Sequence, residues 1–197
     1  MPSVEFLFDF GSPNAFLSHR VIPGIEQRTG AKFEYTPVLL GGIFKATGNQ
    51  SPMQAFGHIK NKPAYEQLEM QRFLRRHHID DFKFNPFFPI NTLNLMRMAV
   101  AAKDEGHLPK YMDAVFHGMW VEPKKMDDPE VAKAALAEGG LDPALYERAQ
   151  AAEVKARLIA NTESAVARGA FGIPTFFVGG EMFFGKDRLR DVEEAIG

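Results

Sequence analysis

The 197-residue sequence predicts an α/β fold in which a β-α-β unit and a β-β-α unit enclose a long helical block. Three patterns lead to this class. β-branched and aromatic residues alternate over Val4–Phe10, which is typical of a strand. A second strand-like run follows at Phe33–Val38, and strand patterns then return only at Ile173. Most of the chain in between has the apolar spacing of helices.

The first unit begins with a strand, a helix and a second strand within about 35 residues, which predicts a right-handed β-α-β crossover. Ser12-Pro13 is a typical helix start, with serine as N-cap and proline in the first turn. Helical spacing then continues to Gly30, and Pro23 within it predicts a kink. The chain therefore turns sharply at Ser12 on leaving the first strand.

Asp9 interrupts the apolar first strand, in the run FDF. A polar residue at such a place fits two interpretations. It is either an exposed strand position or a polar group near a site, and the sequence leaves both open.

The middle of the chain is predicted to be helical after a short irregular stretch. Leu39–Pro52 is rich in Gly, Asn, Ser and Thr, which indicates a loop or short broken elements. Aspartate-proline pairs open two of the helices that follow, as N-cap and first helical residue. The expected helices are Ala64–His77, Asn91–Glu105, Leu108–Trp120, Pro129–Glu138 and Pro143–Arg168.

The C-terminal unit is predicted to be a hairpin followed by a helix. Two extended runs, Ile173–Val178 and Glu181–Phe184, flank Gly179-Gly180, a dipeptide suited to a tight hairpin turn. Lys186–Ile196 then has the apolar spacing of an amphipathic helix. The order of elements is thus β-α-β, a helical block, and β-β-α.

Composition excludes several kinds of chemistry. The 23 basic and 25 acidic residues give a net charge of −2 without a basic run, which argues against a nucleic-acid partner. The absence of cysteine excludes disulfides, thiolate metal sites and a cysteine nucleophile, and the six histidines lack metal-binding spacing, so no metal is expected. Neither a leader nor a membrane span is evident, so we expect a cytoplasmic protein that does not enter a membrane.

Four motifs in a fixed order resemble one family. FDFGSPNAF, NTLNLMR, NTESAVARGAFGIPTFFVG and FFGKDRL together resemble the kappa-class glutathione transferase and 2-hydroxychromene-2-carboxylate isomerase family, a branch of the DsbA-like thioredoxin fold. The likeness runs over essentially the whole chain. It implies a thioredoxin-like, glutathione-binding domain made of residues 1–50 and 170–197, and a helical domain inserted at 51–169.

The resemblance gives Ser12 a second interpretation. Redox-active relatives carry Cys-Pro-x-Cys where this chain reads Ser12-Pro13-Asn14-Ala15. Disulfide exchange needs a protein thiolate, so this chain is not an oxidoreductase of that kind. The family solution is a bound glutathione whose sulfur accepts a hydrogen bond from the serine hydroxyl, at a helix N-terminus that favours thiolate over thiol. Ser12 is then both cap and catalytic residue, whereas the alternative is a cap alone.

The resemblance also implies a set of residues that bind glutathione. Lys62 would reach one carboxylate, Asn49 would hydrogen-bond nearby, and Asp187 would hold the γ-glutamyl ammonium. The peptide bond before Pro174 is expected to be cis, and the backbone of Ile173 to pair with the cysteinyl group. The alternatives are local roles: surface lysine, turn residue, helix-start acid and an ordinary trans proline. The full implied set is Ser12, Pro13, Asn49, Lys62, Ile173, Pro174, Lys186 and Asp187.

The function that the resemblance implies is a glutathione-dependent cis-trans isomerase of naphthalene-type aromatic degradation, acting on 2-hydroxychromene-2-carboxylate as a homodimer. Glutathione thiolate would add to the ring-opened substrate, the former double bond would rotate, and elimination would restore the thiolate. A kappa-type transferase or peroxidase acting on apolar electrophiles is the first alternative. A redox-inactive DsbA-like peptide-binding protein is the second.

The 18 phenylalanines suggest a further, apolar pocket between the two domains. Core packing is the competing role for each aromatic residue. The candidates are Phe44, Phe56, Phe87, Phe88 and Trp120.

Overall fold

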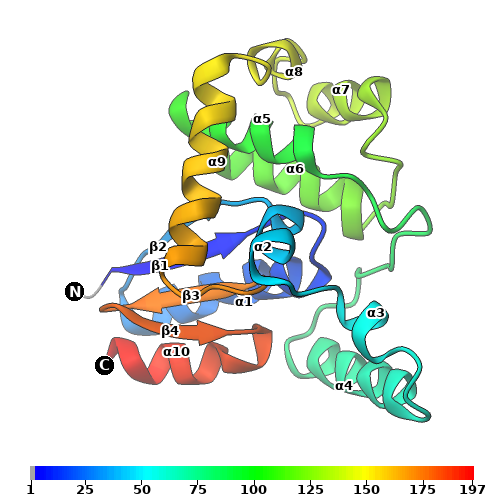
Figure 1. Ribbon diagram of the computed structural model, residues 1–197, viewed down its shortest axis with the longest axis vertical. Coiled ribbons are helices and arrows are strands. Elements are labelled where there is room, and N and C mark those ends of the chain that lie inside the picture. The colour runs from blue at the N-terminus through cyan, green and yellow to red at the C-terminus, as the bar shows by residue number, and fades with distance from the viewer. Residues whose placement is uncertain (1–2) are drawn as a thin grey trace.

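The computed structural model describes residues 3–197. Its strands form one mixed sheet in the order β2-β1-β3-β4, in which β1 is parallel to β2 and antiparallel to β3 (Figure 1). The hairpin predicted around Gly179-Gly180 is confirmed, since β3 and β4 pair antiparallel across these two residues. The strands are β1 (Val4–Phe8), β2 (Phe33–Pro37), β3 (Thr175–Val178) and β4 (Glu181–Phe184). The N-terminal and C-terminal units therefore share one sheet.

The helices follow the predicted order around this sheet. α1 and α10 pack on each other, while α5 and α9 contact the edge strand β2. α7 packs on α6 and α8 on α5 toward one end of the molecule, α2 packs on α9, and α3 and α4 lie together toward the other end (Figure 1). No helix among residues 3–197 is both long and apolar enough to cross a membrane. The helices are α1 (Pro13–Thr29), α2 (Leu40–Thr47), α3 (Pro52–Phe56), α4 (Lys62–Arg76), α5 (Leu93–Asp104), α6 (Leu108–Trp120), α7 (Pro129–Glu138), α8 (Leu145–Arg148), α9 (Ala152–Ala167) and α10 (Leu189–Ile196), with a 3-10 turn, η1 (Lys186–Arg188), before α10.

The core begins on the two central strands. Phe6 on β1 and Phe176 on β3 are fully buried, and their rings stack with centroids 5.0 Å apart. Phe8 and Phe10 extend this aromatic row toward Phe116 on α6, which joins the sheet to the helical block. Buried aromatic surface of this kind is a main source of folding free energy. The division into 1–50 with 170–197 and 51–169 stays a prediction.

Two of the predicted helices are reproduced at both ends. α6 and α7 have the predicted ends, and the Asp128 carboxylate accepts the Glu130 N–H at the start of α7. The single helix predicted for Pro143–Arg168 is wrong. The chain there forms α8 and α9, because Ala151 adopts an extended backbone (ψ 145°) that interrupts helical hydrogen bonding. Alanine carries no signal for such a break, so its position could not be read from the sequence.

The glycine-rich stretch after β2 contains a two-turn helix, α2, within the predicted loop or broken elements. Its start has no local side-chain cap. Instead, the Leu40 N–H donates to the Asp9 carboxylate at 2.8 Å and the Leu39 N–H donates to the Thr162 hydroxyl at 3.0 Å. Both acceptors satisfy donors that a helix start leaves free. They lie 31 and 123 residues away, so local sequence does not reveal this helix.

Two neighbouring glycines of α2 provide a matched test of how closely it packs on α9. A Cβ added at Gly42 would lie 3.1 Å from Thr162 Cγ2, whereas one added at Gly41 would meet no atom within 4 Å. Gly41→Ala should raise the free energy of unfolding by about 0.5–1 kcal/mol, because alanine is the better helix former. Gly42→Ala should lose that gain or destabilise the protein. Chemical denaturation of both variants tests this, and equal stabilisation of the two would contradict the close approach.

Candidate functional site

Ser12 is the N-cap of α1, as predicted. Its hydroxyl oxygen accepts the Ala15 N–H at 3.2 Å, and its own backbone N–H donates to the Asp9 carbonyl at 3.1 Å. Pro13 occupies the first turn of the helix, where no backbone N–H is needed. Only 5% of Ser12 is exposed, so its hydroxyl lies in a largely water-free corner.

The segment before β3 closes this corner from the other side. The Ile173–Pro174 peptide bond is cis, as expected. The Ser12 hydroxyl donates to the Ile173 carbonyl at 3.2 Å, across 161 residues of sequence. Ser12, Pro13, Ile173 and Pro174, which we call the Ser12 corner, are thus brought together as the resemblance implies.

Asp9 stabilises the turn before Ser12 through backbone hydrogen bonds. It is fully buried, so the exposed-strand interpretation is wrong, and its carboxylate lies next to the candidate site. Oδ1 accepts the Gly11 N–H and Oδ2 accepts the Leu40 N–H, each at 2.8 Å. Burial raises the pKa of Asp9 above its ordinary value, while hydrogen bonds from Leu40, Gly11 and Thr92 partly offset that rise.

Sequence reasoning missed two polar residues at this corner. Thr92, at the N-cap position of α5, is buried, and its side chain lies next to Gly11 and the Asp9 carboxylate. Asn14, in the first turn of α1, has a buried Oδ1 that accepts no hydrogen bond, and it is the only such side-chain oxygen within residues 3–197. The position of Thr92 directly before the helical run LNLMR was a signal for a helix start, although its side chain makes no cap bond. Asn14 lies in the run Ser12-Pro13-Asn14-Ala15, but nothing in the sequence gave its side chain a role.

The start of η1 is tied to the Ser12 corner through the backbone. The Gly185 N–H donates to the Pro174 carbonyl at 2.9 Å. Lys186 is buried, with Nζ 2.7 Å from the Asp187 carboxylate and 4.7 Å from the ring centroid of Phe73 on α4. The side chain of Asp187 is 71% exposed, so it remains open to a ligand. Lys186 and Asp187 open the 3-10 turn rather than the last helix itself.

The remaining two predicted residues differ in their placement. Asn49 donates from Nδ2 to the Phe171 carbonyl at 2.7 Å, two residues before Ile173, which places it beside the Ser12 corner. Lys62 instead makes its contacts within its own segment: Nζ lies 2.8 Å from Glu66 and 5.2 Å from the ring centroid of Phe56. The structure therefore brings Asn49 to the corner and gives Lys62 a local ion pair.

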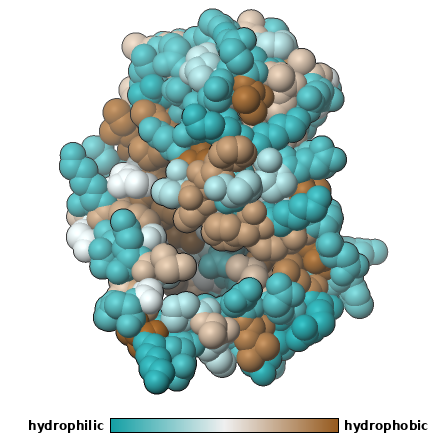
Figure 2. Space-filling view, turned by 90° about the vertical axis from the view of Figure 1, so that its right-hand side faces the viewer, coloured by the Kyte–Doolittle hydropathy of each residue, from teal (hydrophilic) through white to brown (hydrophobic). Residues whose placement is uncertain are grey.

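The aromatic candidates divide between core and surface. Trp120 is fully buried and donates to the Phe10 carbonyl at 2.9 Å, so it is core. Phe87 and Phe88 are partly exposed, and Phe88 together with Phe84 packs against the Trp120 ring. The side of the molecule shown in Figure 2, which lies to the right in Figure 1, has a hollow with apolar side chains along its border. Apolar surface is thus available beyond the core.

These features define a thioredoxin-like fold in which serine, rather than cysteine, begins the helix opposite the cis proline. A family model described as a DSBA-like thioredoxin domain matches residues 3–197. The chain therefore belongs to the DsbA-like thioredoxin family, and the predicted fold class is confirmed.

The relatives carry the two names that the sequence motifs suggested. The chain is 29% identical to the 2-hydroxychromene-2-carboxylate isomerase of Pseudomonas putida, over 98% of this chain and 94% of that protein. It is 26% identical to human glutathione S-transferase kappa 1, over 99% of this chain and 91% of that one. A solved structure of 2-hydroxychromene-2-carboxylate isomerase superposes with a TM-score of 0.83 at 27% identity, covering 99% of this chain and 94% of the other. The predicted resemblance is confirmed.

Replacement of Asp9 tests its support of the corner. Asp9→Asn keeps one oxygen acceptor and places an NH2 group against the other backbone N–H, so it should cost about 1–3 kcal/mol of unfolding free energy. The raised pKa means that the native state holds this proton above pH 3.8, where the unfolded chain releases it. The natural chain therefore loses this stabilisation as pH rises from 3.8 through the raised pKa of native Asp9. The difference in unfolding free energy between the natural chain and Asp9→Asn should shrink over the same pH range.

Urea denaturation at several pH values measures this deficit. The matched control is Asp127→Asn, because Asp127 is exposed. A deficit for Asp9→Asn no larger than that of the control would show that Asp9 does not hold the corner.

Proposed function

We propose that the protein is a glutathione-dependent cis-trans isomerase of 2-hydroxychromene-2-carboxylate-type intermediates in naphthalene-type aromatic degradation. The observation that carries the proposal is the Ser12 hydroxyl beside the Ile173 carbonyl, in a chain without cysteine. Relatives named as this isomerase, similar over nearly the full length, support it. By the same family resemblance, the proposal includes a homodimer in the cytoplasm.

The polar groups at the Ser12 corner suit the cysteinyl part of glutathione. A cysteinyl N–H would take the Ile173 carbonyl as its acceptor, which frees the Ser12 hydroxyl to donate to the sulfur. The Oδ1 of Asn14 in the first turn of α1 is buried and accepts no hydrogen bond, so one polar atom beside the corner is unsatisfied. The corner therefore has donor and acceptor capacity that its own side chains do not use.

The γ-glutamyl part of glutathione carries an ammonium and a carboxylate, so its site needs one negative and one positive group. The exposed Asp187 carboxylate can take an ammonium group, and the buried Lys186 ammonium adds positive charge beside the corner. Asn49 lies near the same segment through its bond to Phe171. Lys62 would contribute to glutathione binding only if it exchanged its ion pair with Glu66 for one with a glutathione carboxylate.

The start of α1 is electrostatically suited to an anionic sulfur. A helix of 17 residues presents its positive dipole end at Ser12, and its first turn contains no acidic residue to neutralise that end. Low exposure of Ser12 keeps water from competing with its hydroxyl. These effects lower the pKa of thiols at helix N-termini in general.

Glutathione, when bound, supplies the thiolate that adds to the conjugated double bond of the substrate and leaves again after rotation. The chain would hold and orient the two reactants: the Ser12 hydroxyl stabilises negative charge on sulfur, and the backbone of Ile173 fixes the cysteinyl group. The Ser12 hydroxyl donates a hydrogen bond to the sulfur and keeps its own proton. The proton of the glutathione thiol would be released to solvent when the thiolate forms.

A kappa-type transferase or peroxidase is the second candidate. The partly exposed Phe84, Phe87 and Phe88 offer apolar surface that suits uncharged electrophiles, and relatives named glutathione S-transferase kappa 1 support it. A redox-inactive peptide-binding protein predicts no glutathione affinity. Retention on immobilised glutathione separates this last possibility from both enzymes.

Ser12→Ala tests the catalytic role. The ultraviolet change of 2-hydroxychromene-2-carboxylate isomerisation should require both the natural protein and glutathione. The variant should lose about 100-fold in kcat/KM, which corresponds to one hydrogen bond to a developing or stabilised anion. It should also lose about 1 kcal/mol of stability, because the cap is removed.

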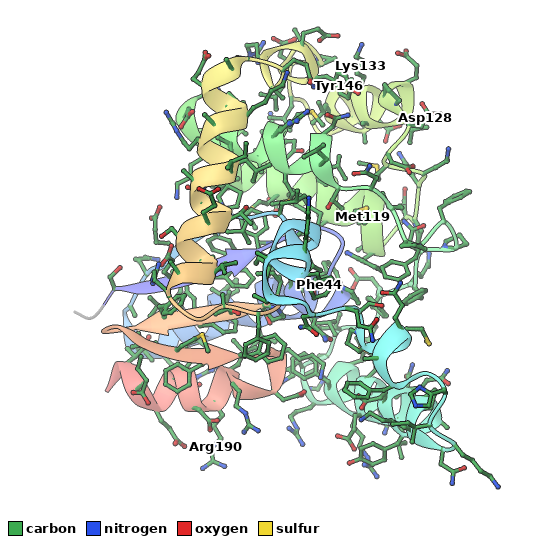
Figure 3. The ribbon with its side chains drawn as sticks, in the orientation of Figure 1. Phe44, Met119, Asp128, Lys133, Tyr146 and Arg190 are labelled. Atoms are coloured by element: carbon green, nitrogen blue, oxygen red, sulfur yellow. The ribbon has the colours of Figure 1, made fainter. Side chains whose placement is uncertain are left out.

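Asp128→Ala is the matched control for the loss of a cap. Asp128 caps α7 in the same Asp/Ser-Pro pattern, at the opposite end of the molecule from α10 (Figure 3). It should lose a similar amount of stability and keep full activity. Full activity in Ser12→Ala would remove Ser12 from the mechanism, and conjugation of apolar electrophiles without any isomerisation would favour the transferase.

Asp187→Asn tests the γ-glutamyl end of the site. Loss of the carboxylate should raise the glutathione concentration for half-maximal rate about tenfold, equivalent to about 1.4 kcal/mol, while kcat stays unchanged. Steady-state kinetics against glutathione concentration measure this. The control is Asp191→Asn, because the partly exposed Asp191 pairs with Arg188 outside the proposed site. An unchanged half-saturation would exclude Asp187 from the site.

A further inference from the structure

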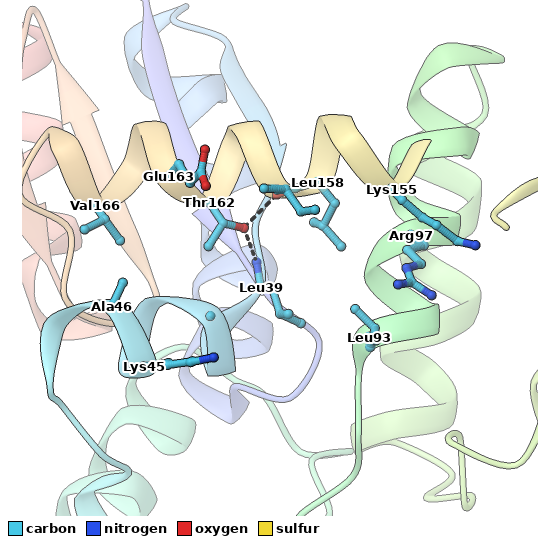
Figure 4. Close-up of a pocket in the computed structure, with 12 residues that line it drawn as sticks. Leu39, Lys45, Ala46, Leu93, Arg97, Lys155, Leu158, Thr162, Glu163 and Val166 are labelled. Carbon is cyan, nitrogen blue, oxygen red and sulfur yellow. Dashed lines mark hydrogen bonds between the residues drawn. The ribbon is translucent and has the colours of Figure 1, made fainter. Parts of the chain in front are cut away.

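A second concave site lies away from the Ser12 corner, between α2, α5 and α9. Its volume is about 500 Å³, within the range of small-molecule sites. None of the residues implied in glutathione binding lines it. The lining residues are Leu39, Gly42, Lys45, Ala46, Leu93, Arg97, Lys155, Leu158, Ile159, Thr162, Glu163 and Val166 (Figure 4). We call this the α2–α9 pocket.

The floor of the α2–α9 pocket is apolar. Leu39, Leu93 and Leu158 come from three different segments and meet around its centre (Figure 4). The polar atom of Thr162 is already used, because its hydroxyl donates to the Leu158 carbonyl and accepts the Leu39 N–H. The floor therefore contacts a ligand through hydrocarbon alone.

The rim of the α2–α9 pocket is cationic. It carries Lys45, Arg97 and Lys155 against the single acid Glu163, which points away from the space between α2 and α5 (Figure 4). Within residues 3–197, Lys45 and Lys155 form no ion pair, whereas Lys62, Lys103, Lys124 and Lys133 elsewhere in the molecule are each paired with a glutamate. Arg97 has only the neutral amide of Gln150 at 3.4 Å. Positive charge at this rim is thus uncompensated.

We propose that the α2–α9 pocket binds an amphipathic organic carboxylate. The apolar body of the acid lies on the leucine floor, and its carboxylate lies between the Lys45 ammonium and the Arg97 guanidinium. Arginine suits this place because its planar group binds carboxylates through two parallel hydrogen bonds. The apolar floor gives burial, and the two cations give the preference for an acid over a neutral molecule.

Isothermal titration with 2-naphthoate, and with 2-naphthamide as its uncharged isostere, tests the proposal. Naphthoate should bind one site per chain at least tenfold more tightly than naphthamide. Lys45→Gln and Arg97→Gln should each weaken naphthoate about tenfold, and Ala46→Phe, which fills the rim from an exposed position, should abolish binding. The matched control is Lys125→Gln, an exposed lysine outside the pocket, which should bind normally.

Three results would overturn the proposal. Equal binding of naphthoate and naphthamide would show that the cations do not select an acid. Displacement of naphthoate by S-methylglutathione, or its loss in Ser12→Ala alone, would place it at the Ser12 corner. Conversion of a dimer to monomers by Ala46→Phe in sedimentation velocity, without naphthoate binding to the natural chain, would make this face a contact between two copies. Melting curves exclude misfolding of each variant.

Discussion

The Asp9 carboxylate accepts the N–H groups of Gly11 and Leu40, each at 2.8 Å, from a position without solvent exposure. One bond fixes the turn that places Ser12 at the start of α1, and the other caps α2, which has no cap of its own. Burial of such a group is costly unless its hydrogen bonds are made. The turn before Ser12 and the start of α2 both depend on this interaction.

With the turn fixed, the Ser12 hydroxyl reaches the Ile173 carbonyl beside the cis proline, and Gly185 links Pro174 to the charged pair Lys186 and Asp187. Redox members of the fold place cysteine at the start of this helix. Here the same helix terminus and the same backbone groups remain, but the sulfur is missing. The proposed binding of an external thiol is based on that combination.

The sequence predicts those parts of the molecule whose determinants are local. Asp128 and its following proline identify the start of α7, and Ser12 with Pro13 that of α1. α2 escaped clear prediction because its caps, Asp9 and Thr162, come from distant segments. The meeting of Ser12 with Ile173 came from family resemblance, since no local pattern encodes a contact across 161 residues.

The ionisation of bound glutathione tests the central claim most directly. An ultraviolet difference titration of the protein with glutathione against pH reports the thiolate. We expect the bound thiol to ionise at least one pH unit below the value of about 8.5 typical of a free cysteine thiol, and to return toward that value in Ser12→Ala. A bound thiol that titrates like the free one in the natural protein would contradict the role assigned to the Ser12 corner.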